Sequence, residues 1–432
     1  MRVVAVVPVK GTSERIENKN IKLLDGKPLF LHTIEKLLSC NFLDEVYLDT
    51  ESDKIIDMVS DYKKLKIFKR DPNLANNKTD GHKLFYNEVK NIEADIYVQI
   101  LCTSPFIKKE TIKKGIEILK EKEYDSVVLV KKDKQYLWGN DSKPLYSTDK
   151  IPNSVDLPDT IIETMGMYIM KKEAALKTQR RYNENVYLLE AEAIEGVDVN
   201  YPEEFKLANY IAAGIREEER KLFKNLAYSI NSSILSDIAD DMGLNTFIGG
   251  LELNLKTHKI FGRANTLKLR RIREGEDYRG IYDAYASYER IVSNDVIVVE
   301  NECRENAYFG EMNANLALRS GAVAAIIDGA TRDRNEVERI NFPTFSDGGI
   351  AQDVRRRAVV ESINKKITIK GVEIYPGDLI YGDRDGIVVI PKKHEKEILK
   401  RVVESIEKEK KVLFNITANT STDEILDKVG EF

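Results

Sequence analysis

Histidine and cysteine are both scarce in this sequence. Its 432 residues include four histidines and three cysteines. Cys40, Cys102 and Cys303 are far apart along the chain, so neither a disulfide framework nor a zinc knuckle is indicated. With so few histidines, a multi-histidine metal site is not expected either. Any bound metal should therefore be a hard cation held by oxygen ligands.

The sequence also lacks a charge excess and a long apolar run. Its 67 Lys+Arg against 72 Asp+Glu give a formal charge of −5, whereas a dedicated nucleic-acid binder carries a concentrated basic excess. The apolar stretch at residues 3–9 is far shorter than the roughly 20 residues that span a bilayer, and it lacks the flanks of a signal peptide. We therefore expect a soluble, cytoplasmic protein that contacts neither nucleic acid nor a membrane.

What the chain does have is length and apolar content. At 432 residues and 42% hydrophobic, it is large enough for two or three domains. In the first half, short β-branched runs alternate with helical apolar spacing, which predicts a doubly wound α/β fold that binds ligands beyond the carboxyl ends of its strands. The expected buried parallel strands are 3–7, 45–48, 96–101 and 126–130, with helices at 29–38 and 109–120.

A polar loop at residues 8–20 follows the first expected strand. Within ten positions it holds one glycine, two hydroxyls and three cations, which would offer N–H groups and positive charge to a polyphosphate. The glycine spacing of a Walker loop or a dinucleotide fingerprint is absent. Composition alone fits a solvated basic loop equally well, but the position directly after a buried strand favours phosphate binding.

This loop begins a series of motifs that resembles the CMP-sugar-acid synthetases, which are the acylneuraminate and 3-deoxy-octulosonate cytidylyltransferases. Each motif is weak by itself, but together they fall in family order over about half of the chain. The resemblance implies a nucleotide-diphospho-sugar-transferase-like, Rossmann-like fold and CTP-dependent transfer of CMP to a 2-keto-3-deoxy sugar acid. The matching segments are 6–15, 18–20, 24–29, 49–53, 70–75, 79–81, 99–105 and 196–204.

The resemblance also implies roles for individual residues. Lys10, Arg15 and Lys19 would hold the triphosphate, and Asp198 would bind magnesium. Relatives commonly carry a second aspartate two residues later, where this chain has Asn200. An amide offers an oxygen but no charge, so the affinity for the metal and the number of metals stay open. Further nucleotide-binding residues would be Gly11, Thr12, Ser13, Asn20, Arg70, Asp80 and Gly81.

The acceptor pocket would involve Gln99, together with residues 131–138 and Tyr168. Asp49 and Asp53, which follow the second expected strand, could assist a metal. Aspartates in that position also commonly cap helices. Capping is the interpretation we favour for both.

The two halves join near residue 220. Residues 205–215 have the apolar spacing of a helix, and residues 216–221 form a dense charge run, which is typical of a solvated helix face or a connector. No linker rich in proline, glycine or serine is present. We therefore expect domains at 1–220 and 221–432, joined by a semi-rigid helix.

The second half has its own motifs. An expected strand at 295–299 is followed by the segments 310–317 and 321–333. The last of these is an apolar strand that ends in Asp-Gly-x-x-Arg-Asp, with Arg332 and Asp333 at its terminus. A turn with a surface ion pair is one interpretation. A buried strand that delivers an adjacent cation and carboxylate favours a functional site instead.

These segments resemble a second family, which contains the class II 4-hydroxy-4-methyl-2-oxoglutarate aldolases and the RraA-like regulators of ribonuclease E. The resemblance covers roughly residues 225–395 and implies an RraA-like α/β fold of the β/β/α swivelling type. An amphipathic helix, expected at 392–414, would serve packing or oligomerisation. The other matching segments are 342–345, 376–378 and 382–386.

The second resemblance implies a metal-dependent site for an oxo acid. Asp333 would hold magnesium or another divalent cation, and Arg332 would face the pyruvate oxygen that becomes an enolate. Glu311 would help to order water at the metal, and the backbone N–H groups around Met312 and Asn313 would hold the carboxylate. Because a subunit interface completes the site in this family, the resemblance implies a homo-oligomer, either a trimer or a hexamer.

Together the two sets of motifs predict a bifunctional enzyme. Aldol condensation of pyruvate with a sugar aldehyde gives a 2-keto-3-deoxy sugar acid, which is the class of acceptor that a CMP-sugar-acid synthetase activates. The expected partners are therefore CTP, such a sugar acid, and pyruvate or a related oxo acid, with a divalent cation at both sites. Two alternatives remain: a cytidylyltransferase with a non-catalytic RraA-like oligomerisation or regulatory domain, and a regulatory protein that binds an RNA-degrading enzyme.

Overall fold

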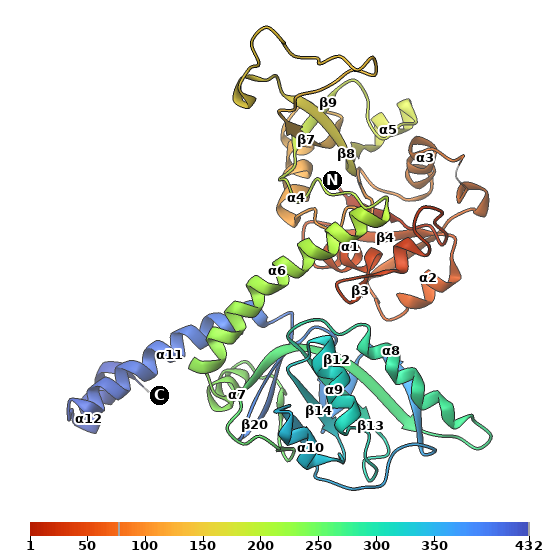
Figure 1. Cartoon of the computed structure of the whole chain (residues 1–432). Coiled ribbons are helices and arrows are strands. Elements are labelled where there is room, and N and C mark those ends of the chain that lie inside the picture. The colour runs from red at the N-terminus through yellow and green to blue at the C-terminus, as the bar shows by residue number, and fades with distance from the viewer. Residues whose placement is uncertain (77, 431–432) are drawn as a thin grey trace. The chain divides into compact units, whose positions relative to one another are not determined.

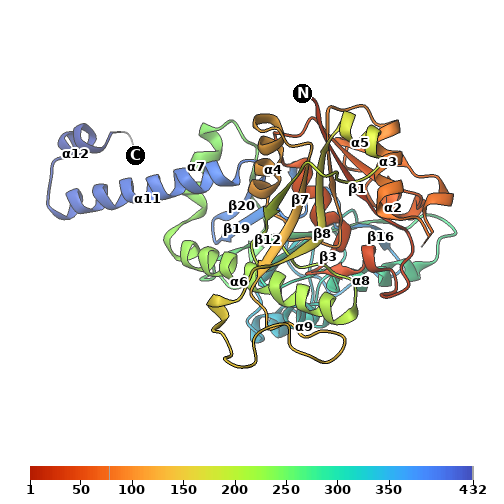
Figure 2. The ribbon, with the colours of Figure 1, turned by 90° about the horizontal axis from the view of Figure 1, so that it is seen from above.

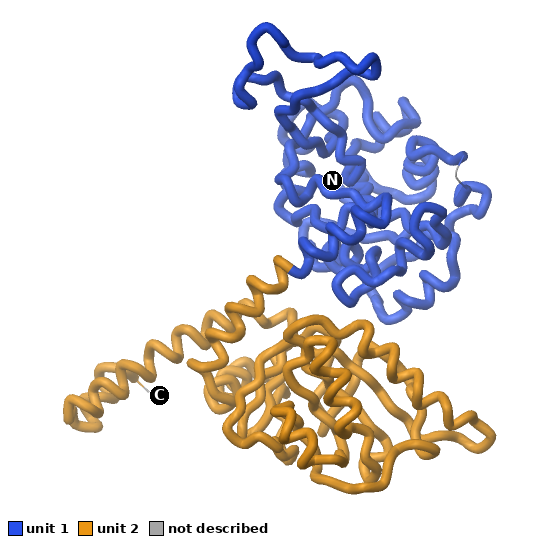
Figure 3. The backbone as a smooth tube through the Cα atoms, viewed as in Figure 1, with its two compact units in different colours: residues 1–213 blue, residues 214–432 orange. Residues whose placement is uncertain are grey.

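The computed structural model describes residues 1–76 and 78–430. The chain divides into two compact units, residues 1–213 and residues 214–432 (Figure 3). Figure 1 shows the elements of each unit. Both units are of the α/β class, as expected.

Unit 1 contains a seven-stranded sheet in the order β5-β4-β1-β6-β8-β7-β9. The four strands predicted from the sequence are confirmed, but the sheet is mixed. Strand β8 pairs antiparallel with both β6 and β7, so it separates two strands that run in the same direction. The strands are β1 (Val3–Pro8), β4 (Glu45–Thr50), β5 (Leu65–Lys69), β6 (Ile96–Ile100), β7 (Ser126–Asp133), β8 (Thr160–Lys171) and β9 (Val186–Glu190), beside the small hairpin β2 (Leu23–Leu24) and β3 (Lys27–Pro28).

Helices cover both faces of this sheet because successive side chains of a strand point to opposite sides. Val3, Ala5 and Val7 of β1 pack into one apolar cluster with α1 and α4. Val4 and Val6 pack into another with α3 and α5. The predicted helices at 29–38 and 109–120 are confirmed. The helices are α1 (Leu29–Leu38), α2 (Asp53–Met58), α3 (Gly81–Asn91), α4 (Lys109–Glu121) and α5 (Lys172–Thr178), with short 3-10 turns η1 (Lys19–Ile21), η2 (Pro72–Leu74) and η3 (Ser154–Asp156).

A single helix, α6 (Pro202–Ser229), runs from unit 1 into unit 2. The predicted helix at 205–215 and the charge run at 216–221 both lie within it. The units divide between residues 213 and 214, whereas the sequence places the boundary near residue 220. Both positions are in this 28-residue helix.

Unit 2 is built on a nine-stranded sheet in the order β10-β20-β19-β12-β13-β14-β15-β11, with β16 paired to β12. Strands β12, β13, β14 and β15 are parallel to one another, and the expected strand at 295–299 is confirmed as β13. The strands are β10 (Phe247–Ile248), β11 (Glu252–Leu253), β12 (Ile260–Arg271), β13 (Asp295–Asn301), β14 (Ala324–Asp328), β15 (Thr344–Ser346), β16 (Ala358–Ile363), β19 (Leu379–Asp383) and β20 (Gly386–Ile390), beside a separate hairpin β17 (Ile367–Ile369) and β18 (Val372–Ile374).

The expected C-terminal amphipathic helix is confirmed as α11 (Glu395–Thr417). Its Ile398 and Val402 pack in one apolar cluster with α7 and the outer strands of the sheet. Beyond α7 this helix continues, and α12 lies beside its far end (Figures 1 and 2). None of the helices in residues 1–76 and 78–430 is both long enough and apolar enough to cross a bilayer. The other helices of unit 2 are α7 (Ser232–Asp241), α8 (Tyr285–Tyr288), α9 (Glu311–Ser320), α10 (Arg334–Arg339) and α12 (Thr422–Val429), with a 3-10 segment η4 (Tyr278–Ala284).

Candidate nucleotide and oxo-acid sites

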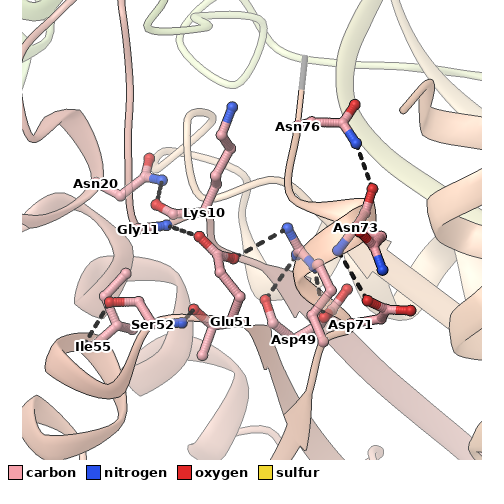
Figure 4. A network of polar contacts seen from close by, with 12 residues as sticks. Lys10, Gly11, Asn20, Asp49, Glu51, Ser52, Ile55, Asp71, Asn73 and Asn76 are labelled. Atoms are coloured by element: carbon pink, nitrogen blue, oxygen red, sulfur yellow. Dashed lines mark hydrogen bonds and ion pairs between the residues drawn. The ribbon is translucent and has the colours of Figure 1, made fainter. Parts of the chain in front are cut away.

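The polar loop after β1 is held in place by side-chain bonds to its backbone (Figure 4). The Asn20 amide donates to the Lys10 carbonyl over 2.8 Å. The Gly11 N–H donates to the Glu51 carboxylate over 2.6 Å. A Cβ at Gly11 would lie 2.8 Å from Cβ of Ser52, so only glycine allows this close approach to the turn after β4. Asn20 thus holds the backbone of the loop in place. The sequence predicts a contact between Asn20 and the nucleotide and does not predict this structural role.

The turn after β4 contains a buried ion pair. Arg70 is 3% exposed, and its Nε donates to Asp49 over 2.9 Å. Another guanidinium nitrogen lies 3.7 Å from Glu51 (Figure 4). The Arg70 guanidinium therefore joins the strand end to the residue that binds the Gly11 N–H. Its proposed contact with the nucleotide remains a prediction.

The interpretation of Asp49 and Asp53 as helix caps is wrong. The Ser52 hydroxyl caps α2 by accepting from the Ile55 N–H. Asp49 is fully buried and bonded to Arg70, and Asp53 is the first residue of the helix itself. Ser52, one position before Asp53, supplies the cap, so neither aspartate is needed for it. Asp49 instead forms an ion pair with Arg70.

Two of the three predicted triphosphate cations converge on the segment after Asp198. Lys19 is buried, and its Nζ donates to the Val199 carbonyl over 2.8 Å, 180 residues along the chain. The Arg15 guanidinium lies over the Tyr201 ring at 5.2 Å. Burial lowers the pKa of Lys19, and the nearby Asp198 carboxylate opposes part of that shift. The loop and the aspartate segment therefore lie side by side in the fold.

Asp198 is oriented by two neighbours. The Ser104 hydroxyl lies 3.5 Å from one carboxylate oxygen, and the Asn200 amide donates to the other. Across residues 1–76 and 78–430, no cluster of three or more His, Cys, Asp and Glu side chains could enclose a metal. Magnesium is commonly held by one or two carboxylates and completed by substrate phosphates and water. A single aspartate beside the polar loop fits that pattern.

The predicted acceptor residue Gln99 belongs to a buried network that the sequence did not reveal. Its side-chain amide donates to Glu88 over 2.6 Å, and both residues have no exposed surface. Burial raises the pKa of Glu88 well above its ordinary value, and the adjacent Asp49 adds to the shift. Hydrogen bonds thus link Arg70, Asp49, Glu88 and Gln99. No sequence motif spans this set.

The remaining predicted nucleotide residues occupy the loop and the start of α3. Thr12 is exposed and Ser13 is partly exposed. The Asp80 carboxylate caps α3 by accepting from the Lys83 N–H over 3.0 Å. Gly81 is the first residue of that helix. Gly81 thus presents a backbone N–H group of a helix start, which suits an anion, whereas Thr12 and Ser13 lie in the loop.

In unit 2, Arg332 and Asp333 follow β14 and lie next to the start of α9. The Arg332 N–H donates to the Phe309 carbonyl over 2.9 Å. The Glu311 N–H, at the first residue of α9, donates to the Asp333 carboxylate over 3.3 Å. The structure therefore brings together the two motifs that the sequence analysis singled out. Asp333 is the cap residue of α10, with a left-handed φ of 52°.

The side chains around this site leave a carboxylate and several N–H groups available. The side chain of Asp333 is 43% exposed, and its Oδ2 accepts from the Glu311 N–H and lies 3.6 Å from Nε of Arg332. Its Oδ1 is the oxygen available to a divalent cation. N–H groups in the first turn of a helix have no partner within that helix, and those of Met312 and Asn313 are in this position in α9. The guanidinium of Arg332 lies 3.0 Å from Asp353, a partner that the sequence analysis missed because it is 21 residues away and outside both motifs.

Comparison with known proteins assigns a family to each half. Residues 4–215 match the profile of a family described as cytidylyltransferase. Residues 234–389 match the profile described as Aldolase/RraA, RraA-like. The chain joins a cytidylyltransferase-family domain to an RraA-like domain. Both predicted resemblances are confirmed.

Individual relatives match one domain each. The cytidylyltransferase domain is 34% identical over 125 residues to CMP-N,N'-diacetyllegionaminic acid synthase of Legionella pneumophila, covering 28% of this chain and 54% of the relative. The RraA-like domain is 29% identical over 175 residues to a candidate 4-hydroxy-4-methyl-2-oxoglutarate aldolase of Halalkalibacterium halodurans, covering 40% of this chain and 78% of the relative. This chain is also 26% identical over 175 residues to protein DlpA of L. pneumophila, covering 40% of this chain but only 28% of that longer protein.

Proposed function

We propose that this chain is a bifunctional enzyme. Its cytidylyltransferase domain would transfer CMP from CTP to a 2-keto-3-deoxy sugar acid, with release of pyrophosphate. Its RraA-like domain would carry out metal-dependent pyruvate-type aldol or oxo-acid lyase chemistry. The observation that carries the first activity is the convergence of the phosphate loop on the Asp198 segment through the Lys19–Val199 bond.

In the cytidylyltransferase domain, charge would build on phosphate oxygens as the anomeric hydroxyl attacks the α-phosphorus and pyrophosphate leaves. Lys10, Arg15 and Lys19 would hold the triphosphate and stabilise that charge. Asp198 would hold magnesium, which supplies further charge stabilisation when bound. The Asn200 amide, which donates to Asp198, fixes the direction of that carboxylate.

In the RraA-like domain, the first turn of α9 would bind the carboxylate of pyruvate through the Met312 and Asn313 N–H groups. Asp333 would hold a divalent cation that polarises the pyruvyl group when bound. Arg332 would stabilise the negative charge that develops on the pyruvyl oxygen, and it would exchange its contact with Asp353 for that oxygen. Glu311 would order water at the same site.

A chemical relation between the two reactions supports their presence in one chain. Condensation of pyruvate with a sugar aldehyde produces a 2-keto-3-deoxy sugar acid. That product has the carboxylate and anomeric hydroxyl that a CMP-sugar-acid synthetase requires. We further expect the RraA-like domain to assemble a trimer or hexamer, which light scattering after size-exclusion chromatography would measure.

The first test is pyrophosphate release from CTP with magnesium and a panel of 2-keto-3-deoxy sugar acids. We expect turnover with at least one acid of the panel and none without acid. No release with any acid would refute the cytidylyltransferase assignment for this substrate class.

The second test separates two enzymes from an enzyme with a non-catalytic module. We expect the wild type to release pyruvate from the same 2-keto-3-deoxy sugar acid that it uses in cytidylyl transfer. Asp333→Ala should abolish that release while cytidylyl transfer continues. Asp427→Ala, an exposed position on α12, is the matched control and should leave both activities unchanged. If the wild type cleaves no oxo acid with magnesium or manganese, the RraA-like domain is an oligomerisation or regulatory module.

A further inference from the structure

Arg181 is a buried cation in the segment between α5 and β9 of unit 1. It is 6% exposed. Its guanidinium carbon lies 4.8 Å from the centre of the Tyr168 ring and against Gly81, where an added Cβ would collide with it. Its backbone N–H donates to Nδ1 of His82 over 3.1 Å. The side chain is therefore enclosed between β8 and the start of α3.

This guanidinium has no anionic partner within residues 1–76 and 78–430. No carboxylate lies within 4.0 Å of it, and its buried Nε has no hydrogen-bond acceptor. The guanidinium does interact with the neutral Tyr168 hydroxyl, which is bonded to Glu163. The other deeply buried arginine of unit 1, Arg70, is bonded to Asp49. A buried charge without a partner is costly, and proteins normally pair it. An unpaired buried arginine therefore indicates a ligand that brings the anion.

The surroundings of Arg181 place it at the proposed site of the cytidylyltransferase domain. Tyr168 on β8 is directly opposite Gln99 on β6, and directly opposite residues of neighbouring strands share one face of the sheet. Gln99 is the predicted acceptor residue, and Gly81 belongs to the predicted nucleotide segment. Arg181 thus lies beside Gly81 on one side and beside Tyr168, the strand neighbour of Gln99, on the other.

We propose that Arg181 binds the carboxylate of the acceptor sugar acid. This inference rests on the proposed cytidylyl transfer and adds a specific contact to it. The planar guanidinium fork matches a carboxylate in two parallel hydrogen bonds. In a 2-keto-3-deoxy acid, the carboxylate is attached to the anomeric carbon whose hydroxyl attacks. Fixing that carboxylate next to the nucleotide segment therefore also fixes the attacking oxygen.

The kinetic test compares wild type with Arg181→Gln and Arg181→Lys on the acid that the wild type uses best, with N-acetylneuraminate and 3-deoxy-octulosonate as first probes. Loss of two charge-assisted hydrogen bonds should raise KM for the acid by about 100-fold or more and leave KM for CTP within about twofold. Lysine should recover only part of the loss because it cannot form the bidentate contact. The neighbouring exposed Arg180→Gln is the matched control.

A substrate-side test uses the methyl ester of the same acid, which lacks the negative charge. Relative to wild type with the free acid, wild type with the ester and Arg181→Gln with the free acid should lose activity to the same extent. The ester and the substitution together should cost little more than either alone. Additive losses would show that Arg181 acts elsewhere and would overturn the inference.

A stability readout distinguishes binding from a structural role. Because Arg181 has no protein anion to lose, Arg181→Met should unfold at the same or a higher temperature than wild type. A large fall in the unfolding temperature, an unchanged KM for the acid, or a raised KM for CTP would each overturn the proposal. Failure of the proposed function is separate, since it would show as wild type that releases no pyrophosphate with any acid.

Discussion

Glu88 allows a sharp test of the buried network beneath the proposed nucleotide site. Its side chain has no exposed surface, and it is hydrogen-bonded to Asp49 on one side and to Gln99 on the other. One oxygen of Glu88 and one of Asp49 have no other partner, and a proton carried by Glu88 would satisfy both. Glutamine has the shape of a protonated glutamate and never ionises. We therefore expect Glu88→Gln to preserve the network and to remove its dependence on pH.

The sign of the effect follows from the raised pKa of Glu88 in the folded state. The unfolded chain releases the Glu88 proton above about pH 4.5, whereas the folded chain keeps it to a higher pH. The contribution of protonated Glu88 to the free energy of unfolding is therefore complete below about pH 4.5 and falls as the pH rises towards the folded pKa. Within that window the loss is about 1.4 kcal/mol per pH unit. Between pH 5 and 7, the free energy of unfolding of Glu88→Gln should therefore rise relative to that of wild type.

The assay should read unit 1 separately from unit 2. Wild type and variant are equilibrated in urea at several pH values and then pulse-labelled with deuterium at one fixed pH, and peptides from α3 and β6 report the unfolding of unit 1. Glu121→Gln, at an exposed position that ends α4, serves as the control and should follow the wild-type pH profile. A difference between Glu88→Gln and wild type that stays flat from pH 5 to 8 would refute a buried protonated Glu88. Cytidylyl transfer should change only a few-fold, because glutamine still accepts from Gln99.

Three further changes probe the two proposed metal sites and the stability of unit 2. Asn200→Asp replaces the amide that donates to Asp198 with a second carboxylate, so we expect the magnesium concentration for half-maximal cytidylyl transfer to fall about tenfold; an unchanged magnesium titration would contradict this. Gly310→Ala places a Cβ 2.6 Å from an Asp333 oxygen, and should abolish oxo-acid cleavage, measured as pyruvate release, while CTP turnover persists. Burial raises the pKa of Asp295 to about 7, so wild-type unit 2 should lose about 3 kcal/mol of stability between pH 4 and 7. Asp295→Asn should retain that stability, as thermal unfolding at pH 4 and 7 would show.

The elements of the fold were predictable because they depend on local patterns. The strand at β1 and the helix at α1 follow from apolar runs and helical spacing within about ten residues of each other. The antiparallel insertion of β8 between β6 and β7 was not predictable, because strand order depends on pairing between distant segments. Nothing in the composition of residues 160–171 encodes which two strands they separate.

The same distinction explains which site residues were found. Lys19 and Asp198 were named because each lies in a recognisable motif, although only the fold shows that their segments touch. Glu88 was missed because it lies mid-helix in α3 with no flanking motif. Its chemistry comes entirely from burial against Asp49 and Gln99.

Arg181 shows most clearly what cannot be predicted from the sequence, because its proposed role depends on the absence of a carboxylate near its guanidinium. In the sequence it is one of two adjacent arginines after a short helix, and a solvated pair is the ordinary expectation for such a dipeptide. The fold exposes Arg180 and buries Arg181 against Tyr168 and Gly81 without a carboxylate. A missing counter-charge cannot be read from residue types or spacing, since it requires knowledge of every side chain that comes near. Sites that await a charged ligand are therefore found by pairing each buried charge with its partners in three dimensions.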